Sequence, residues 1–123
     1  MRKTILVVED QEDNRQILRD LLGSVGFAMQ EAENGEEALT AVAKQRPDLI
    51  LMDIQLPLLD GYETTRRLKG NPETKGIPII VVTSYALSRD EAKARECGCD
   101  AYVTKPYSPR ALLAKIKEFL PQT

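Results

Sequence analysis

The chain has 123 residues, of which 42% are hydrophobic, and 17 Lys and Arg residues against 19 Asp and Glu residues give a formal net charge of −2. This length suits a single domain over residues 1–123, and the near-balanced charge gives no electrostatic basis for direct nucleic-acid binding. Because the sequence has no His, mechanisms that need an imidazole in this chain are excluded, among them Ser-His-Asp catalysis, His-ligated metals and phosphohistidine carriers.

The sequence carries few signs of targeting or of redox chemistry. No apolar run approaches the roughly 20 residues of a membrane-spanning helix, so we expect no membrane association. Residues 1–4 leave no room for a signal peptide before the first apolar run, which favours a cytoplasmic location. Cys97 and Cys99 cannot complete a tetrahedral zinc site without a further Cys or His, and we interpret them as small structural side chains.

The first predicted strand and helix stand at the start of the chain. Residues 5–8 form a short apolar run, typical of a buried parallel strand, that stops at Glu9 and Asp10. The next segment has the 3.6-residue period of a helix, with Asp13 or Asn14 as its cap. Its predicted apolar stripe consists of Ile17, Leu18, Leu21, Leu22 and Val25.

The same alternation continues through the middle of the chain. Residues 27–32 form a short extended piece, and Asn34 begins a second helix that stops before Pro47. Residues 49–52 form another apolar run, and this one stops at Asp53.

A third helix and another strand follow. Asp60 begins a helix that runs through about Leu68, where a Gly-Asn-Pro sequence breaks it. Residues 79–82 are an apolar run of Ile and Val that stops at Thr83 and Ser84. A hydroxyl pair therefore ends this strand, whereas carboxylates follow the apolar runs at residues 5–8 and 49–52.

The predicted fourth helix is marked by a capping box. Ser88 is its N-cap, Glu91 reaches back to the start of the helix, and Gly98 ends it. Residues 101–103 form the last strand, which runs into Thr-Lys-Pro with Lys105 at its centre.

The fifth predicted helix has Ser108 as its N-cap and Pro109 at its first position. Pro121 ends it. Its apolar stripe consists of Leu112, Leu113, Ile116, Phe119 and Leu120.

Five strands alternating with five helices predict an α/β fold. Strict alternation implies right-handed crossovers and a parallel sheet with helices on both faces, the doubly wound arrangement. For five strands we expect the flavodoxin-like order 2-1-3-4-5, in which the first and third strands are neighbours. This order places Glu9 and Asp10 beside Asp53, at the sheet edge where such folds bind ligands.

Three carboxylates at one edge imply a cation. Each close pair repels by about 4 kcal/mol at about 4 Å and an effective dielectric of about 20. Hard oxygen donors favour Mg²⁺, with Mn²⁺ as the alternative. Asp53 could then act as a nucleophile that forms an acyl-phosphate, while Lys105 and Thr83 bind the phosphoryl oxygens.

Each of these residues also has a purely structural interpretation. Asp53 could satisfy the amides of a turn, and Asp10 could cap the first helix. Thr83 could be a turn residue and Lys105 a solvated charge. What favours a site is that all of them stand at strand ends of one predicted sheet.

The chain resembles the receiver domain of two-component response regulators, and the resemblance covers essentially its whole length. It is most similar to free-standing, single-domain members of the chemotaxis and cell-polarity (DivK-like) type. The segments that carry the resemblance are residues 8–10, 51–57, 60–61, 82–84 and 102–106.

The resemblance implies a set of site residues. Asp53 would be the phosphoacceptor, and Thr83 and Lys105 would bind the phosphoryl group. The Lys105–Pro106 peptide would be cis. The Mg²⁺ ligands would be Glu9, Asp10, Asp53 and the backbone carbonyl of Gln55.

The resemblance also implies a switch. Tyr102 would swing inward when Thr83 moves, and so change the face made by the fourth helix, fifth strand and fifth helix. Without the resemblance, Tyr102 is better explained as a core or half-exposed Tyr. Gln55 and Tyr85 stand at positions that tune phosphoryl lifetime in the family, and their size predicts slow self-dephosphorylation here.

The implied function is a phosphorelay switch and not an enzyme with a separate substrate. A histidine kinase or histidine phosphotransfer protein would be the donor, a downstream protein the target, and the chain a monomer or weak phosphorylation-dependent dimer. Three alternatives remain: a phosphohydrolase that uses Asp53, a flavin-binding module and a pseudo-receiver that only docks. Gln55 in place of a second acid argues against the first, and the acidic residues 9–13 would repel a flavin phosphate.

Overall fold

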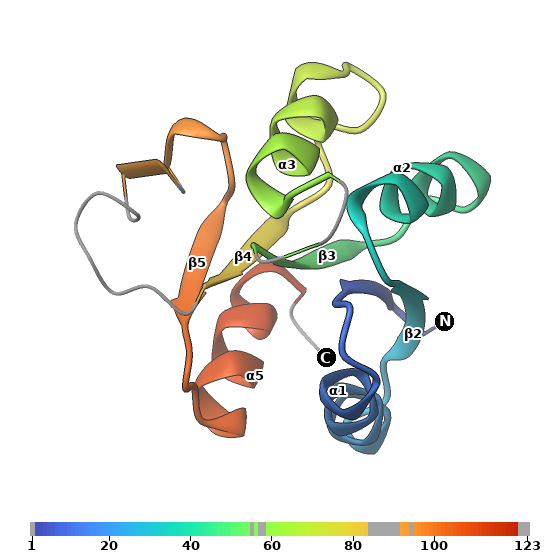
Figure 1. Cartoon of the computed structure of the whole chain (residues 1–123). Coiled ribbons are helices and arrows are strands. Elements are labelled where there is room, and N and C mark those ends of the chain that lie inside the picture. The colour runs from blue at the N-terminus through green and yellow to red at the C-terminus, as the bar shows by residue number, and fades with distance from the viewer. Residues whose placement is uncertain (1, 55, 57–58, 84–91, 94, 121–123) are drawn as a thin grey trace.

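The computed structural model describes residues 2–54, 56, 59–83, 92–93 and 95–120. Its strands form one parallel sheet in the order β2-β1-β3-β4-β5, which confirms the predicted flavodoxin-like topology (Figure 1). The strands are β1 (Thr4–Val8), β2 (Ala28–Ala32), β3 (Leu49–Asp53), β4 (Ile79–Thr83) and β5 (Ala101–Thr104).

The burial of the strands follows their place in the sheet. Every residue of β3 and β4 is buried, as expected for central strands covered on both faces. The edge strands β2 and β5 are mostly half-buried, and β2 is correspondingly the least apolar of the five. The continuous apolar runs therefore form the three central strands, β1, β3 and β4, and predicted site residues stand at or directly after the carboxyl ends of these strands.

Four helices have defined bounds within the described residues: α1 (Glu12–Ser24), α2 (Gly35–Lys44), α3 (Gly61–Gly70) and α5 (Pro109–Phe119). Figure 1 shows α1 and α5 on one face of the sheet and α2 and α3 on the other. Two apolar cores result, one containing Leu18, Leu22, Leu112 and Ile116, the other containing Ala38, Val42 and Leu68. No helix in the described residues is long and apolar enough to cross a membrane.

The helix starts predicted from capping residues are confirmed for three helices. The side chains of Asn34, Asp60 and Ser108 each accept a hydrogen bond from a backbone N–H three residues further on, at 2.8, 2.8 and 3.0 Å. Pro109 occupies the first turn of α5, as its missing N–H allows. Pro121, the predicted end of α5, lies outside the described residues.

The first helix differs from its prediction at its cap and at one residue of its apolar stripe. Its N-cap is Gln11, whose side chain makes no capping bond, so the prediction of Asp13 or Asn14 as cap was wrong. Leu18 and Leu22 of the predicted stripe are buried and Leu21 and Val25 pack against the same core, whereas Ile17 is 59% exposed and Arg15 is buried. Arg15 forms ion pairs with Glu31 and Glu33, which lie outside the helix and could not be read from its periodicity.

The predicted fourth helix falls mostly outside the described residues, including its capping residues Ser88 and Glu91. Residues 92–93 and 95–96 are helical, and Gly98 follows with a φ of +90° that favours glycine, as predicted for the helix end. Cys97 is buried in the core against α2 and α3, which agrees with its interpretation as a structural side chain.

Candidate functional site

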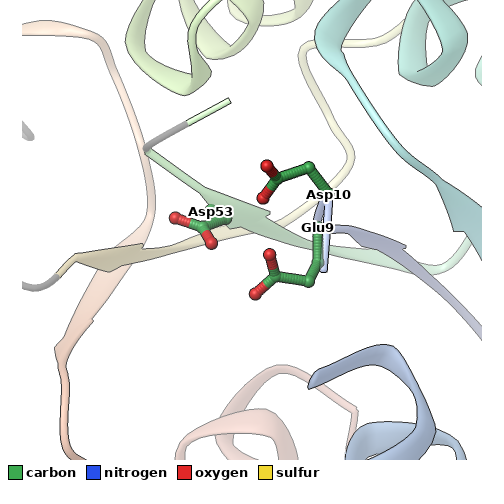
Figure 2. A group of neighbouring side chains, drawn as sticks. All are labelled: Glu9, Asp10 and Asp53. Atoms are coloured by element: carbon green, nitrogen blue, oxygen red, sulfur yellow. The ribbon is translucent and has the colours of Figure 1, made fainter. Parts of the chain in front are cut away.

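The acidic residues predicted to converge do so. Glu9 and Asp10 follow β1, and Asp53 is the last residue of β3, the strand that pairs with β1. One carboxylate oxygen from each of the three lies within 4.8 Å of the others, and Figure 2 shows the three carboxylates gathered at this edge. We call Glu9, Asp10 and Asp53 the carboxylate cluster.

Two members of the carboxylate cluster are buried, and the third, Asp10, is half-buried. Glu9 is 4% exposed and Asp53 is 7% exposed. Burial raises the pKa of Glu9 from its ordinary value of 4.5 to about 7; the backbone N–H of Gln11 opposes the rise, and Asp53 adds to it. The cluster therefore binds a proton near neutral pH unless a cation takes its place.

Neighbouring groups fix the orientation of the Glu9 side chain. One carboxylate oxygen accepts a hydrogen bond from the backbone N–H of Gln11 at 3.1 Å. The other accepts one from the side-chain amide of Asn14 at 3.1 Å. Asn14, predicted as a helix cap, thus donates its side-chain amide to Glu9 instead. This contact depends on the turn between β1 and α1, which the periodicity of the sequence does not specify.

Lys105 reaches the carboxylate cluster from the segment after β5. Its Nζ lies 3.1 Å from Oδ2 of Asp53 and 3.6 Å from Oε1 of Glu9. Burial acts to lower the pKa of the Lys105 ammonium, but the facing carboxylates of Asp53 and Glu9 raise it overall. Lys105 is therefore a fixed positive charge directed at Asp53, as predicted.

Thr83 and Tyr102 occupy the strands on the other side of β3. Thr83 is buried at the end of β4, one residue beyond Val82, which pairs with Asp53. Its backbone carbonyl accepts the N–H of Lys105 at 2.6 Å, so these two predicted phosphoryl-binding residues are joined through their main chains. Tyr102 lies half-buried on β5, packed against the core beneath α2 and α3.

Other predictions for this region have different outcomes. The Lys105–Pro106 peptide is cis, as predicted. Gln55, whose backbone carbonyl was a predicted metal ligand, and Ser84 and Tyr85 lie outside the described residues.

Gly61 is a site residue whose importance the sequence did not reveal. A Cβ at this position would overlap the carbonyl oxygen of Asp53 and lie 2.9 Å from the Cα of Ile54, closer than real Cβ atoms come to such groups. The start of α3 is therefore packed directly on the backbone of the Asp53 strand end. The Asp60–Gly61 pair predicted a helix start, but only the fold shows that Gly61 packs against the backbone of Asp53 and Ile54.

Tyr107 is another residue that the prediction missed. It lines a cavity of about 20 Å³ together with Glu9, Asp53 and Lys105, and the rest of the wall is apolar, including Val7, Leu18, Leu51, Val82 and Leu112. Burial raises the pKa of the Tyr107 hydroxyl; Lys105 opposes the rise, and Glu9 and Asp53 add to it. Glu9 and Asp53 thus border a cavity with mostly apolar walls, which accounts for their desolvation.

The donor set fits a small divalent cation. Lys105 contributes one positive charge beside the cluster, whereas the three carboxylates, when ionised, carry three negative charges. Mg²⁺ and Mn²⁺ prefer hard oxygen ligands and would neutralise this charge. Glu9, Asp10 and Asp53 are the residues that would hold such an ion.

Comparison with known proteins places this site in a family. Residues 5–117 match the response regulator receiver domain. The polar-differentiation response regulator DivK of Brucella anthropi is 44% identical over 120 residues, which covers 98% of each chain.

Solved structures agree with this assignment. The receiver domain of sensor histidine kinase PA1611 from Pseudomonas aeruginosa PAO1, with a magnesium ion coordinated in its active-site cleft, is 31% identical with a TM-score of 0.90 and covers 99% of this chain and 100% of that one. The Mn²⁺-bound form of response regulator Rcp1 is 28% identical with a TM-score of 0.83, covering 98% and 96%. The chain therefore belongs to the response regulator receiver domain family.

Proposed function

We propose that this chain is a phosphorelay switch in which Asp53 accepts a phosphoryl group in a Mg²⁺-dependent reaction, with Mn²⁺ as a possible substitute. The donor would be a histidine kinase or a histidine phosphotransfer protein, since this chain has no His of its own. The observation that carries the proposal is the carboxylate cluster, in which Glu9 and Asp53 are buried, with the Lys105 ammonium 3.1 Å from Asp53. That combination suits transfer of a dianionic group to a carboxylate.

In the proposed reaction, the Asp53 carboxylate attacks the phosphorus of the donor's phosphohistidine. An O–P bond forms, the P–N bond breaks, and the imidazole leaves with its electron pair. Lys105 binds a phosphoryl oxygen, and the hydroxyl of Thr83 binds another. Glu9, Asp10, Asp53 and the backbone carbonyl of Gln55 would hold the metal ion, which would supply positive charge to the phosphoryl oxygens.

The output is proposed to be a change in partner binding. Thr83 and Lys105 are joined through the backbone, and Lys105 follows the strand that carries Tyr102. A phosphoryl group that attracts Thr83 and Lys105 would therefore act on β5 and the face it makes with the preceding helix and α5. The new state then binds a downstream protein, or a second copy weakly, to the extent that phosphorylation favours it.

The chain is proposed to act on its own phosphoryl group and not on a separate substrate. Self-dephosphorylation is expected to be slow because of the large side chains at Gln55 and Tyr85. A cytoplasmic location remains a prediction. A phosphohydrolase would need a second acid for its leaving group, and Gln55 stands where one is expected.

Intact-mass measurement after incubation with acetyl phosphate and Mg²⁺ tests the proposal. We expect one phosphoryl adduct on the wild-type chain and none on Asp53→Asn. Asp20→Asn, which changes an exposed Asp on α1, is the matched control and should be phosphorylated like the wild type. A wild-type chain without an adduct, or an equal adduct on Asp53→Asn, would contradict the proposal.

A further inference from the structure

Arg15 is a charged residue at a buried position of α1. Its side chain is enclosed between α1 and the end of β2, and the residue is 7% exposed. An apolar residue would fill this position without the penalty of desolvating a charge. The contacts of the guanidinium therefore indicate the role of the Arg15 charge.

The guanidinium of Arg15 bonds to groups from three segments. Its Nε donates to Glu31 at 3.1 Å, and its Nη2 lies 3.3 Å from a carboxylate oxygen of Glu33 and also bonds Glu12. Its Nη1 donates to the backbone carbonyl of Glu9 at 2.8 Å. The last bond is buried and joins Arg15 directly to the backbone of the carboxylate cluster.

The hydrogen bond from Arg15 to the Glu9 carbonyl affects the position of both Glu9 and Asp10. It belongs to the peptide group between Glu9 and Asp10, so its direction sets the direction in which the chain continues to Asp10. The N–H of Glu9 is held by the carbonyl of Ala32 at 3.0 Å. Arg15, anchored by the acidic residues at and after the end of β2, holds the other side of the residue.

We propose that Arg15 is a positioning residue that orients the Glu9–Asp10 peptide so that both carboxylates face the metal. The proposal rests on the proposed function, because it assumes that the carboxylate cluster binds a divalent cation. Arg15 touches neither the ion nor the phosphoryl group. It acts through the backbone, as outer-shell partners of metal ligands commonly do.

Geometry and charge predict opposite results when Arg15 is replaced. Removing a positive charge near a cation site strengthens cation binding by electrostatics alone. Removing a group that orients two ligands weakens it. The direction of the change in metal affinity therefore separates the two explanations.

Arg19 provides a matched control on the same helix. It shares Glu12 and Glu31 with Arg15, at 3.4 and 2.6 Å, but its hydrogen bonds go to side chains and not to the Glu9 backbone. Arg19→Met removes the same charge and disturbs two of the three acidic residues that Arg15 contacts, Glu12 and Glu31. It leaves the Arg15 bond to Glu9 in place.

The experiment measures Mn²⁺ binding, by EPR of the free ion, to wild type, Arg15→Met, Arg15→Lys and Arg19→Met. We expect Arg15→Met to bind Mn²⁺ about tenfold more weakly, within the usual effect of an outer-shell substitution. Arg15→Lys should also bind more weakly, because a single ammonium prefers the carboxylates and leaves the carbonyl. Arg19→Met should bind Mn²⁺ at least as tightly as the wild type.

Circular dichroism and urea unfolding of each variant establish that it is folded. If Arg15→Met does not fold, Arg15→Lys, which keeps the charge, carries the test. The proposal is overturned if the folded Arg15 variants bind Mn²⁺ as tightly as the wild type, or if Arg19→Met loses as much affinity as Arg15→Met. A wild-type chain that binds Mn²⁺ but gains no phosphoryl adduct would overturn the proposed function and leave this inference standing on the affinities.

Discussion

Replacing Glu9 with Gln should stabilise the metal-free protein above neutral pH. The pKa of Glu9 is raised from 4.5 to about 7, by burial first, so the folded protein keeps a proton that the unfolded chain releases near pH 4.5. Between these values the folded state binds more protons than the unfolded state, and the free energy of unfolding therefore falls as pH rises. The uncharged amide introduced by Glu9→Gln would mimic the protonated carboxyl group and remove this fall.

The two pKa values set the size of the effect. The difference between 4.5 and about 7 corresponds to a loss of about 3 kcal/mol in the free energy of unfolding, complete by about pH 8. We therefore expect Glu9→Gln and the wild type to be similar in stability near pH 4.5. At pH 8 in EDTA, the variant should be more stable by up to about 3 kcal/mol.

Urea unfolding followed by circular dichroism between pH 5 and pH 8 measures this difference. Saturating Mg²⁺ should restore the stability of the wild type at pH 8 and help Glu9→Gln less, since the ion replaces the proton and the variant lacks one ligand. Glu36→Gln, at an exposed position of α2, is the matched control and should follow the wild type. Parallel pH profiles of the wild type and Glu9→Gln in EDTA would refute the reasoning.

Three further substitutions test other parts of the account. Gly61→Ala should lower the free energy of unfolding by about 1–3 kcal/mol, because the added Cβ meets the backbone at the Asp53 end of β3. Gly23→Ala, whose added Cβ has nothing within 4 Å, should raise the free energy of unfolding by up to about 1 kcal/mol. Equal effects of the two substitutions in urea unfolding would contradict this. Lys105→Met should bind Mn²⁺ up to about tenfold more tightly, because the ammonium that repels the cation is gone. The variant should also accept the phosphoryl group of acetyl phosphate more slowly, because the ammonium that would bind this group is gone. Unchanged Mn²⁺ affinity and phosphorylation rate would argue against the proposed role of Lys105. Ser108→Ala should lower the free energy of unfolding by about 1 kcal/mol through loss of the α5 cap, and an unchanged urea midpoint would show that the cap contributes nothing.

The sheet and the convergence of the carboxylates could be predicted because they depend on short-range patterns. The runs that became β1, β3 and β4 are apolar because both faces of a central strand are covered. Right-handed alternation then leaves few strand orders, and the observed one places Asp53 beside the residues after β1. The caps of α2, α3 and α5 were equally accessible, since each bond spans three residues.

What the sequence could not supply depends on contacts between distant segments. Arg15 is buried because acidic residues at and beyond the end of β2 surround it, and Ile17 is exposed because the helix turns that side to solvent. The fit of Gly61 against Ile54 likewise exists only after α3 packs on the end of β3. Periodicity within one segment contains no information on such pairs.

Transfer from a P–N donor tests the central claim most directly. Phosphoramidate carries the type of bond found in phosphohistidine, and intact-mass measurement with peptide mapping locates the phosphoryl group that it donates. The account predicts a single adduct on Asp53 that forms with Mg²⁺, does not form in EDTA and is released by hydroxylamine, as an acyl-phosphate should be. An adduct on another residue, or one that forms equally well in EDTA, would contradict it.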